Sequence, residues 1–342
     1  MQAPSIKDVA RRSGVSYKTV SRVVNGEGHV SSATRERVQD AVAELGYRPH
    51  HAARSMRSGR TQTLRLIFTH RTERFLANPF QTDLLAGVVD AATQLGYGIL
   101  VELRGVGDLD EASPIRAARL GQRVDGTILL DSNPDSPHVE ELITGNGPAV
   151  VVANREVHPA LGWVHTAFEA GAHEAVSHLI GLGHRQIAHI ADDPSLRSSV
   201  ERRAGYERAL GDAGIGPDPA LVVLAGQMRH NGAEAVDRLV GAGVGFTALF
   251  CVNDLTALGA IESLARHALR VPLDVSVIGY DDVSFAEYAV PSLTTVHIPW
   301  YEMGATAFAM IVDALDDPAT FPRGVELPVE LRVRGSTGPV PS

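Results

Sequence analysis

Apolar residues between positions 5 and 45 recur every three or four residues, which is the period of an α-helix. They form three stripes: Ile6, Val9 and Ala10; Val20, Val23 and Val24; and Val38, Ala41, Val42 and Leu45. Gly14 separates the first two stripes and permits the left-handed backbone conformation that ends a helix. Ser5 with Asp8 forms a capping-box pattern, and Ser16 can cap the second helix. The sequence therefore predicts three short helices, with a tight turn between the first two.

The side of the second predicted helix that faces away from its valines is polar and partly basic. It carries Tyr17, Lys18, Ser21 and Arg22. A short helix that follows a tight turn and exposes such residues is typical of a helix-turn-helix, whose second helix enters the major groove of DNA. We therefore expect double-stranded DNA as a partner.

From residue 64 onward, short apolar runs alternate with amphipathic segments. The predicted strands are Leu64–Phe68, Gly98–Val101, Gly126–Leu130, Ala149–Val152, Gln186–Ile190, Leu221–Leu224, Ala248–Cys251 and Val275–Ile278. The predicted helices are Phe80–Leu95, Pro114–Gln122, His138–Ile143, Gly171–Ile180, Val200–Ala213, Gly232–Val240 and Leu255–His267, with one more around Met303–Leu315. Such alternation predicts an α/β fold with parallel sheets that are covered by helices on both faces.

The alternation starts again after Asn154, which predicts a two-lobed body with a cleft. Ligands of such sheets bind outside the carboxyl ends of the strands. The predicted domains are a helix-turn-helix head at 1–48, a hinge and linker at 49–60, and the body at 61–342. Lobe 1 is expected to comprise about 61–155 and 298–315, and lobe 2 about 165–290 and the C-terminal strands. The tail at 335–342 is expected to be flexible.

Charge is distributed unevenly along the chain. The net charge is -9, yet residues 1–60 alone carry +6 and the remaining residues carry -15. A basic head on an acidic body fits a DNA-binding module joined to a body that repels phosphate. The only cysteine, Cys251, has no partner for an intrachain disulfide, and no apolar run approaches the roughly 20 residues of a membrane span. These features favour a cytoplasmic protein with no membrane partner.

Several stretches of the chain, in order, carry a family resemblance. They are Ile6–Ala10, Gly14–Gly26, Val30–Met56, Gly183–Ile187, Arg202–Tyr206, Cys251–Gly259, Val275–Asp282 and Pro291–Thr295. The chain resembles the lac repressor (LacI) family of bacterial transcription regulators over nearly its whole length. The resemblance implies a homodimeric, ligand-responsive repressor with a body of the periplasmic-binding-protein-like fold. It also implies a pseudo-palindromic operator, because a two-fold dimer reads a two-fold site.

The resemblance implies DNA contacts in the head. Tyr17, Lys18 and Arg22 match positions that reach base edges, and an arginine can form a bidentate pair with guanine. Short polar side chains suited to phosphate contacts, which set register without reading sequence, are Ser16, Thr19, Ser21, Asn25, Ser31 and Thr34. Capping by Ser16 and Ser31 is compatible with phosphate contact.

The segment 49–60 offers only about two helical turns, so this hinge helix should form only when a partner supports it. Met56 occupies the position of the family's apolar wedge, which enters the minor groove and kinks the operator. Ala53 is small where the hinge helices of two subunits should approach each other.

The resemblance also implies an effector site in the body. Arg202, Asn253 and Asp281 match positions that hydrogen-bond the effector, and Phe80 matches an aromatic stacking position in some members. Polar pairing between the lobes is the alternative reading of the three polar residues, and ordinary core packing is the alternative for Phe80. The three polar residues suit the hydroxyls of a sugar, which is the expected small-molecule effector, or the edge of a nucleobase. The chain departs from the family at Trp163–Phe168, where the usual polar contacts are absent or replaced by His165 or Thr166, and at Gln227–Arg229. Both departures fall in the pocket, so the identity of the effector and its sign of action stay open.

Two other functions would share part of this pattern. A transporter's solute-binding protein would share the two-lobed body, but it would need a signal peptide and would not carry residues 5–57. A ligand-independent DNA-binding protein would not need the polar residues of the cleft. An enzyme has no support, because the sequence holds no Walker-type loop and no Gly-x-Ser-x-Gly elbow. We accordingly expect no catalytic residue, no cofactor and no metal site.

Overall fold

The computed structural model describes residues 4–25, 28–47, 60–68, 79–103, 124–130, 137–145 and 147–341. It divides into two compact units, Met1–Thr61 and Gln62–Ser342, which we describe separately. The hinge with Ala53 and Met56 and the helix expected at Pro114–Gln122 lie outside the described residues, so those predictions stay untested.

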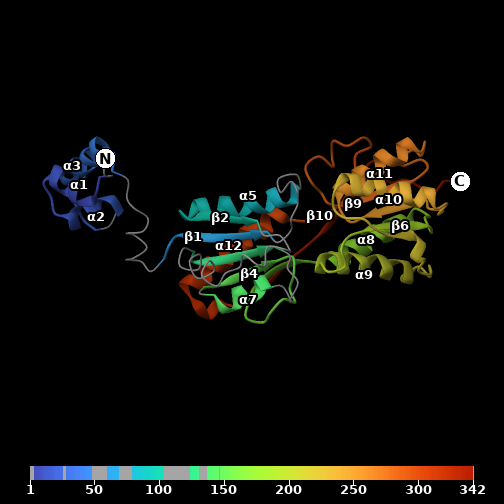
Figure 1. Cartoon of the computed structure of the whole chain (residues 1–342), viewed down its shortest axis with the longest axis horizontal. Coiled ribbons are helices and arrows are strands. Elements are labelled where there is room, and N and C mark those ends of the chain that lie inside the picture. The colour runs from blue at the N-terminus through green and yellow to red at the C-terminus, as the bar shows by residue number, and fades with distance from the viewer. Residues whose placement is uncertain are drawn as a thin grey trace. The chain divides into compact units, whose positions relative to one another are not determined.

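The described residues of the head unit form three helices: α1 (Ile6–Ser13), α2 (Tyr17–Asn25) and α3 (Ser32–Leu45) (Figure 1). The predicted apolar stripes meet in one small core that includes Val9, Val20 and Val38, all fully buried. At the start of α1, the amide of Ser5 donates to a carboxylate oxygen of Asp8 at 2.9 Å, and Gly14 ends the helix at φ 67°. The predicted caps and turn are therefore confirmed.

Lobe 1 is built on a six-stranded parallel sheet with the order β11-β5-β4-β3-β1-β2. Its strands are β1 (Thr63–Phe68), β2 (Gly98–Leu103), β3 (Gly126–Leu130), β4 (Ala149–Val152), β5 (Gly162–Thr166) and β11 (Gly324–Leu327). Its helices are α5 (Pro79–Gln94), α7 (Pro137–Thr144) and α12 (Trp300–Asp316). Gly87 on α5 and Gly304 on α12 let these two helices touch, because a Cβ at either position would overlap the backbone of the other helix.

Lobe 2 is built on a second six-stranded sheet with the order β12-β10-β9-β8-β6-β7, in which only β12 is antiparallel to its neighbour. Its strands are β6 (Ile187–Ala191), β7 (Val222–Leu224), β8 (Ala248–Cys251), β9 (Ser276–Asp281), β10 (Thr294–His297) and β12 (Glu330–Arg332). Its helices pack in two pairs: α8 (Phe168–Gly181) with α9 (Arg197–Asp212), and α10 (Arg229–Gly241) with α11 (Asp254–Arg266) (Figure 1).

The chain passes between the two lobes three times, after β5, after β10 and after β11. This connectivity corrects the expected division of the body, which placed both C-terminal strands in lobe 2. β11 pairs with β5 in the sheet of lobe 1, and only β12 belongs to lobe 2. A strand's own residues specify its two faces but not its neighbour, because the neighbour is set by pairing across long sequence separations.

The tail expected to be flexible is instead bound to lobe 2. The hydroxyl of Ser336 donates to the carbonyl of Val277 at 2.6 Å, and the amide of Gly338 donates to the hydroxyl of Ser276 at 3.0 Å. His184 is fully buried beneath the tail, with Nε2 3.0 Å from the carbonyl oxygen of Gly338. Small polar residues of the tail pair with the end of a buried strand, a contact that composition does not reveal.

Candidate DNA-binding face and interlobe site

The predicted reading face of α2 is exposed. Tyr17 has 56% of its surface accessible, and Lys18 and Arg22 are also exposed, whereas Val20 and Val23 of the same helix are buried. Within the described part of the chain, neither Lys18 nor Arg22 takes part in an ion pair. Both side chains therefore lie at the surface of the head.

Two of the predicted phosphate contacts also cap helices. The amide of Thr19 donates to the hydroxyl oxygen of Ser16 at 3.1 Å, and the amide of Thr34 donates to that of Ser31 at 3.4 Å. Thr19 and Thr34 are half-buried beside these caps, as is Ser21 on α2. The capping prediction is confirmed, and the phosphate contacts stay predictions. The side chain of Asn25 lies outside the described part.

In lobe 2, Arg202 is buried and held from several sides. Its Nη1 donates to the carbonyl of Val252 at 3.1 Å, and its Nη2 lies 3.5 Å from Oδ1 of Asp281. The guanidinium stands over the rings of Phe168 and Tyr280, 5.0 and 4.5 Å from their centroids. A desolvated cation between two aromatic faces gains on the order of 2 kcal/mol from each good contact. The structure therefore brings Arg202 and Asp281 into contact within lobe 2, and their contact with an effector stays a prediction.

Asp281 is the last residue of β9 and has an unusual environment. Burial raises the pKa of its carboxyl to about 7, although the neighbouring Arg202 guanidinium acts in the opposite direction. Its backbone has a φ of 104°, and the next residue, Asp282, has a φ of 57°. Such conformations are costly for residues other than glycine and cluster at functional sites. Asp282 is held in place by Arg334 at 2.7 Å and His297 at 3.2 Å.

Asn253 is engaged in holding the fold. Its Oδ1 accepts from the amide of Thr256 at 2.8 Å and so caps α11, and its Nδ2 donates to the carbonyl of Gln227 at 2.9 Å. The side chain of Gln227 donates to Asp192 at 2.6 Å. Asn253 therefore ties together the loops that end β6, β7 and β8, and any effector contact would use its remaining hydrogen-bonding capacity.

A row of aromatic rings joins the two lobes. Phe80, near the start of α5, packs against Trp300 at the start of α12, with ring centroids 4.6 Å apart. Trp300 in turn lies 6.3 Å from Phe168 of α8, the ring that supports Arg202. Phe80 also packs against the hydrophobic core, so both of its predicted roles are compatible with its position.

The departure at Trp163–Phe168 places a polar group between the lobes. His165 of β5 is fully buried, with Nε2 3.0 Å from Oε2 of Glu201 on α9 and Nδ1 3.8 Å from Oε2 of Glu326 on β11. Thr166 points elsewhere and donates to the carbonyl of Leu327 at 2.9 Å. Of the two residues suggested by the sequence, His165 contacts the other lobe, whereas Thr166 hydrogen-bonds the neighbouring strand β11.

Glu201 is the centre of a chain of ion pairs across the lobes. Arg197, one turn earlier on α9, lies 2.9 Å from Glu201 and 2.8 Å from Glu156, which follows β4 in lobe 1. Burial raises the pKa of the Glu201 carboxyl, but the neighbouring His165 and Arg197 outweigh it and hold the pKa below its usual value. Glu201 is therefore charged at neutral pH although it is almost inaccessible to water.

Buried polar atoms without a hydrogen-bond partner gather in the same region. In the part of the chain that the structure describes, they are Gln81 Oε1, His165 Nδ1, Ser199 Oγ, Arg202 Nε and Trp300 Nε1. His165 Nε2 is not one of them, because Oε2 of Glu201 lies 3.0 Å away. The residues that carry the unpaired atoms stand at the start of α5, the end of β5, the first turns of α9 and the start of α12. These ends are linked by the contacts of His165 and Trp300 described above. We call this group the interlobe site.

Native proteins pair most buried polar groups, so a cluster of unpaired ones calls for an explanation such as a bound ligand. Gln81, Ser199 and Trp300 were not predicted from the sequence. The sequence could have indicated them by their position, because they lie in the first turns of helices that follow strand ends, where ligands of parallel sheets bind.

Comparison with known proteins identifies the family. Residues 5–50 match the bacterial regulatory proteins of the lacI family, and residues 176–337 match a periplasmic binding protein-like domain. The HTH-type transcriptional regulator CelR of Thermobifida fusca is 34% identical over 336 residues, which cover 97% of this chain and 98% of that protein. The chain belongs to the lacI family. As a member, it is a DNA-binding transcriptional regulator.

Solved lacI-family structures agree over the full length. A CelR–cellobiose complex has 34% identity and a TM-score of 0.73, covering 97% of this chain and 99% of the other. A lac repressor dimer bound to operator and the anti-inducer ONPF has 31% identity and a TM-score of 0.86, covering 98% and 100%. The predicted family and fold class are therefore confirmed.

These relatives are regulators and not enzymes. The described ranges contain no group of three or more His, Cys, Asp or Glu residues that could hold a metal ion. Within those same ranges, no helix has the length and apolar character needed to cross a membrane.

Proposed function

We propose that this lacI-family regulator is a homodimeric repressor whose affinity for a pseudo-palindromic operator is set by a sugar bound at the interlobe site. The cluster of unpaired buried polar atoms between the lobes carries this proposal, because a hydroxyl-rich ligand would supply their missing partners. The sugar complex of CelR and the operator complex of the lac repressor dimer support it. We place its action in the cytoplasm, where bacterial DNA is found.

In this proposal the exposed face of α2 reads the operator. Tyr17, Lys18 and Arg22 contact base edges. The backbone phosphates are contacted by Ser16, Thr19, Ser21, Asn25, Ser31 and Thr34. Met56 enters the minor groove from the hinge, where Ala53 lets two hinge helices approach. The exposure of the α2 residues and the matched residues of the head support these assignments.

The composition of the interlobe site favours a neutral, hydroxylated ligand. Phe80 and Trp300 provide an apolar ring surface, while Arg202, Asp281 and His165 provide donors and acceptors at its edge. A sugar ring combines an apolar face with a rim of hydroxyl groups. Asp281 and Arg202 already compensate each other's charge, so the site does not select strongly for an anion or a cation.

Ligand binding at this place acts on contacts between the lobes. Glu201 and Arg197 of lobe 2 are paired with His165 and Glu156 of lobe 1, so a ligand that changes the lobe spacing also changes these pairs. Operator affinity and effector affinity are then coupled, and the coupling is reciprocal. An inducer favours the spacing that releases DNA, and a corepressor favours the spacing that holds it.

The test is a thermal-shift screen of purified protein with cellobiose, glucose, ribose, maltose and adenine, followed by operator binding with any ligand that raises Tm. Ser199→Ala removes one unpaired hydroxyl and should leave the ligand-free protein as stable as before, but weaken the ligand by about 5-fold or more. Ser195→Ala, an exposed serine just before the same helix, is the matched control. A ligand that stabilises wild type and Ser199→Ala equally would remove the interlobe site from effector binding.

A further inference from the structure

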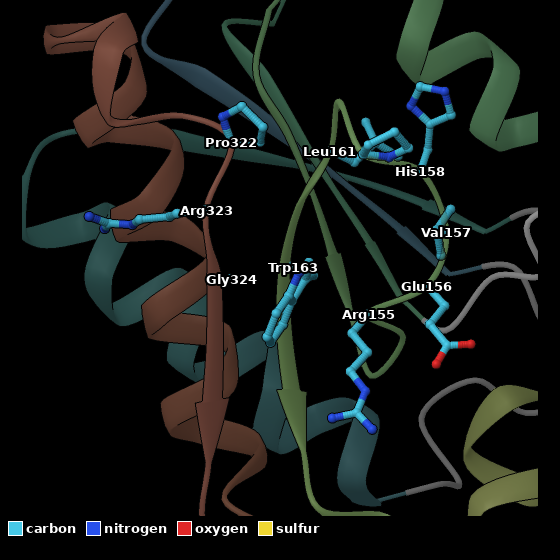
Figure 2. Close-up of a pocket in the computed structure, with 10 residues that line it drawn as sticks. Arg155, Glu156, Val157, His158, Leu161, Trp163, Pro322, Arg323 and Gly324 are labelled. Atoms are coloured by element: carbon cyan, nitrogen blue, oxygen red, sulfur yellow. The ribbon is translucent and has the colours of Figure 1, made fainter.

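A separate cavity lies beside the edge strand β11 of the lobe 1 sheet. It measures about 390 Å³ and is enclosed by the loop 155–161, by β5 and by the start of β11 (Figure 2). Cavities of roughly 300–1,000 Å³ are the usual size for small-molecule sites. None of the unpaired polar atoms of the interlobe site belongs to its lining residues.

Trp163 of β5 provides a flat wall of this cavity. Its partner in the neighbouring strand β11 is Gly324, and a Cβ at that position would overlap the indole ring. The indole therefore lies against bare backbone, which holds its plane in place. Pro159 and Pro322 also line the cavity, together with the buried side chains of Val157 and Leu161. These surfaces suit a planar, apolar ring.

Two arginines border the cavity on either side of Trp163 (Figure 2). Arg155 lies 2.9 Å from Glu326, and Arg323 lies 2.7 Å from Asp313; both arginine side chains are 41% exposed. An exposed ion pair contributes only about 0–1 kcal/mol. A guanidinium has five donors, so each of these arginines can also bind a ligand anion, or exchange its carboxylate for one.

We propose that this cavity is a second small-molecule site, for a planar aromatic compound that carries one carboxylate or phosphate group. The ring packs on Trp163 and the prolines, and the anion binds Arg155. Glu326 competes with the ligand for Arg155, because the carboxylate already occupies one of its nitrogens. The cavity and the interlobe site share no lining residue, but Glu326 lies next to both, 2.9 Å from Arg155 and 3.8 Å from Nδ1 of His165.

Fluorescence of a single tryptophan tests the proposal in the full-length protein. The chain has two tryptophans, so Trp300→Phe leaves Trp163 as the sole indole. The probes are 4-nitrophenyl phosphate and 4-nitrobenzoate, with 4-nitrobenzyl alcohol as the neutral analogue. We expect saturable quenching by one or both anions and at least 10-fold weaker binding of the neutral analogue; the stronger anion shows whether phosphate or carboxylate is preferred.

Three variants in this background sharpen the result. Arg155→Gln should weaken the anion about 10-fold, and Glu326→Gln should tighten it about 3-fold, because the competing carboxylate is gone. Arg203→Gln is the matched control, since Arg203 is also 41% exposed and also paired with one glutamate, but lies on α9 outside the cavity. Quenching that does not saturate, equal binding of the neutral analogue, or equal effects of Arg155→Gln and Arg203→Gln would overturn the proposal.

Discussion

The proposed DNA-reading face and the interlobe site place their side chains in opposite environments. On α2, Tyr17, Lys18 and Arg22 are exposed and stand within six consecutive residues. Between the lobes, Gln81, Arg202 and Trp300 are buried and come from three distant segments. Exposed residues can change without disturbing the fold, whereas buried ones support the fold that positions them. Substitutions on the exposed face of α2 should therefore change DNA binding with little effect on stability. Substitutions in the interlobe site should change both ligand binding and stability.

The largest expected effect is at Arg202. Arg202→Ala leaves Asp281 buried without its cation, and losing one partner of a buried pair costs about 3–5 kcal/mol. Because the pKa of Asp281 is raised to about 7, its carboxyl is charged at pH 8 and largely neutral at pH 5. The loss of unfolding free energy should thus be greater at pH 8 than at pH 5, as measured by urea unfolding. Arg203→Ala on the same helix is the control. Equal losses of unfolding free energy in the two variants would contradict the expected difference between buried and exposed side chains.

The next effect concerns the pH dependence of the body. His189 is buried between the rings of Tyr206 and Phe250, and burial lowers its pKa to about 4. The unfolded chain binds this proton at about pH 6.5, so the native state should lose stability as pH falls from 6.5 towards 4, by about 3 kcal/mol. His189→Gln should flatten the unfolding free energy in that window. An unchanged slope would show that His189 does not cause it.

Arg22→Ala should separate function from stability in the head. Because Arg22 is exposed and unpaired within the described residues, we expect no more than about 0.5 kcal/mol change in unfolding. Binding to the cognate operator should weaken by about 1–3 kcal/mol, with little change on random DNA. Fluorescence anisotropy with both DNAs measures this difference. Equal losses on both would assign Arg22 to the phosphate backbone instead of base readout.

Ser16 is an exposed residue at which stability and DNA binding should change together, because it caps α2 and is also a proposed phosphate contact. Ser16→Ala tests this exception. Loss of an N-cap costs about 1 kcal/mol of helix stability. Operator and random DNA should both bind more weakly, and the helical circular dichroism of the head should melt earlier. Ser16→Asp restores the cap but adds a negative charge, so it should recover the melting temperature and not the DNA affinity. Recovery of both would leave Ser16 with capping as its whole role.

Sequence-based prediction was accurate for local features and missed features that depend on long-range contacts. The helices of the head and most strands of the body were predicted within a few residues, because caps, glycine turns and apolar periods act over one or two turns of chain. The partner of β11, the binding of the tail and the capping role of Asn253 were not predicted. Each depends on contacts between residues far apart in the sequence, which periodicity does not encode.

By itself, the sequence determined the kind of protein: a basic three-helix head, an α/β body and the exposed polar face of the second helix, because these properties are local. It also predicted a departure from the family pattern at Trp163–Phe168. Only the tertiary structure decided what that departure does, since it alone brings His165 of β5 against Glu201 of α9 and places unpaired polar atoms from five residues between two lobes. The physical reason is that burial and unmet hydrogen bonds are properties of packing, and packing is set by the whole chain.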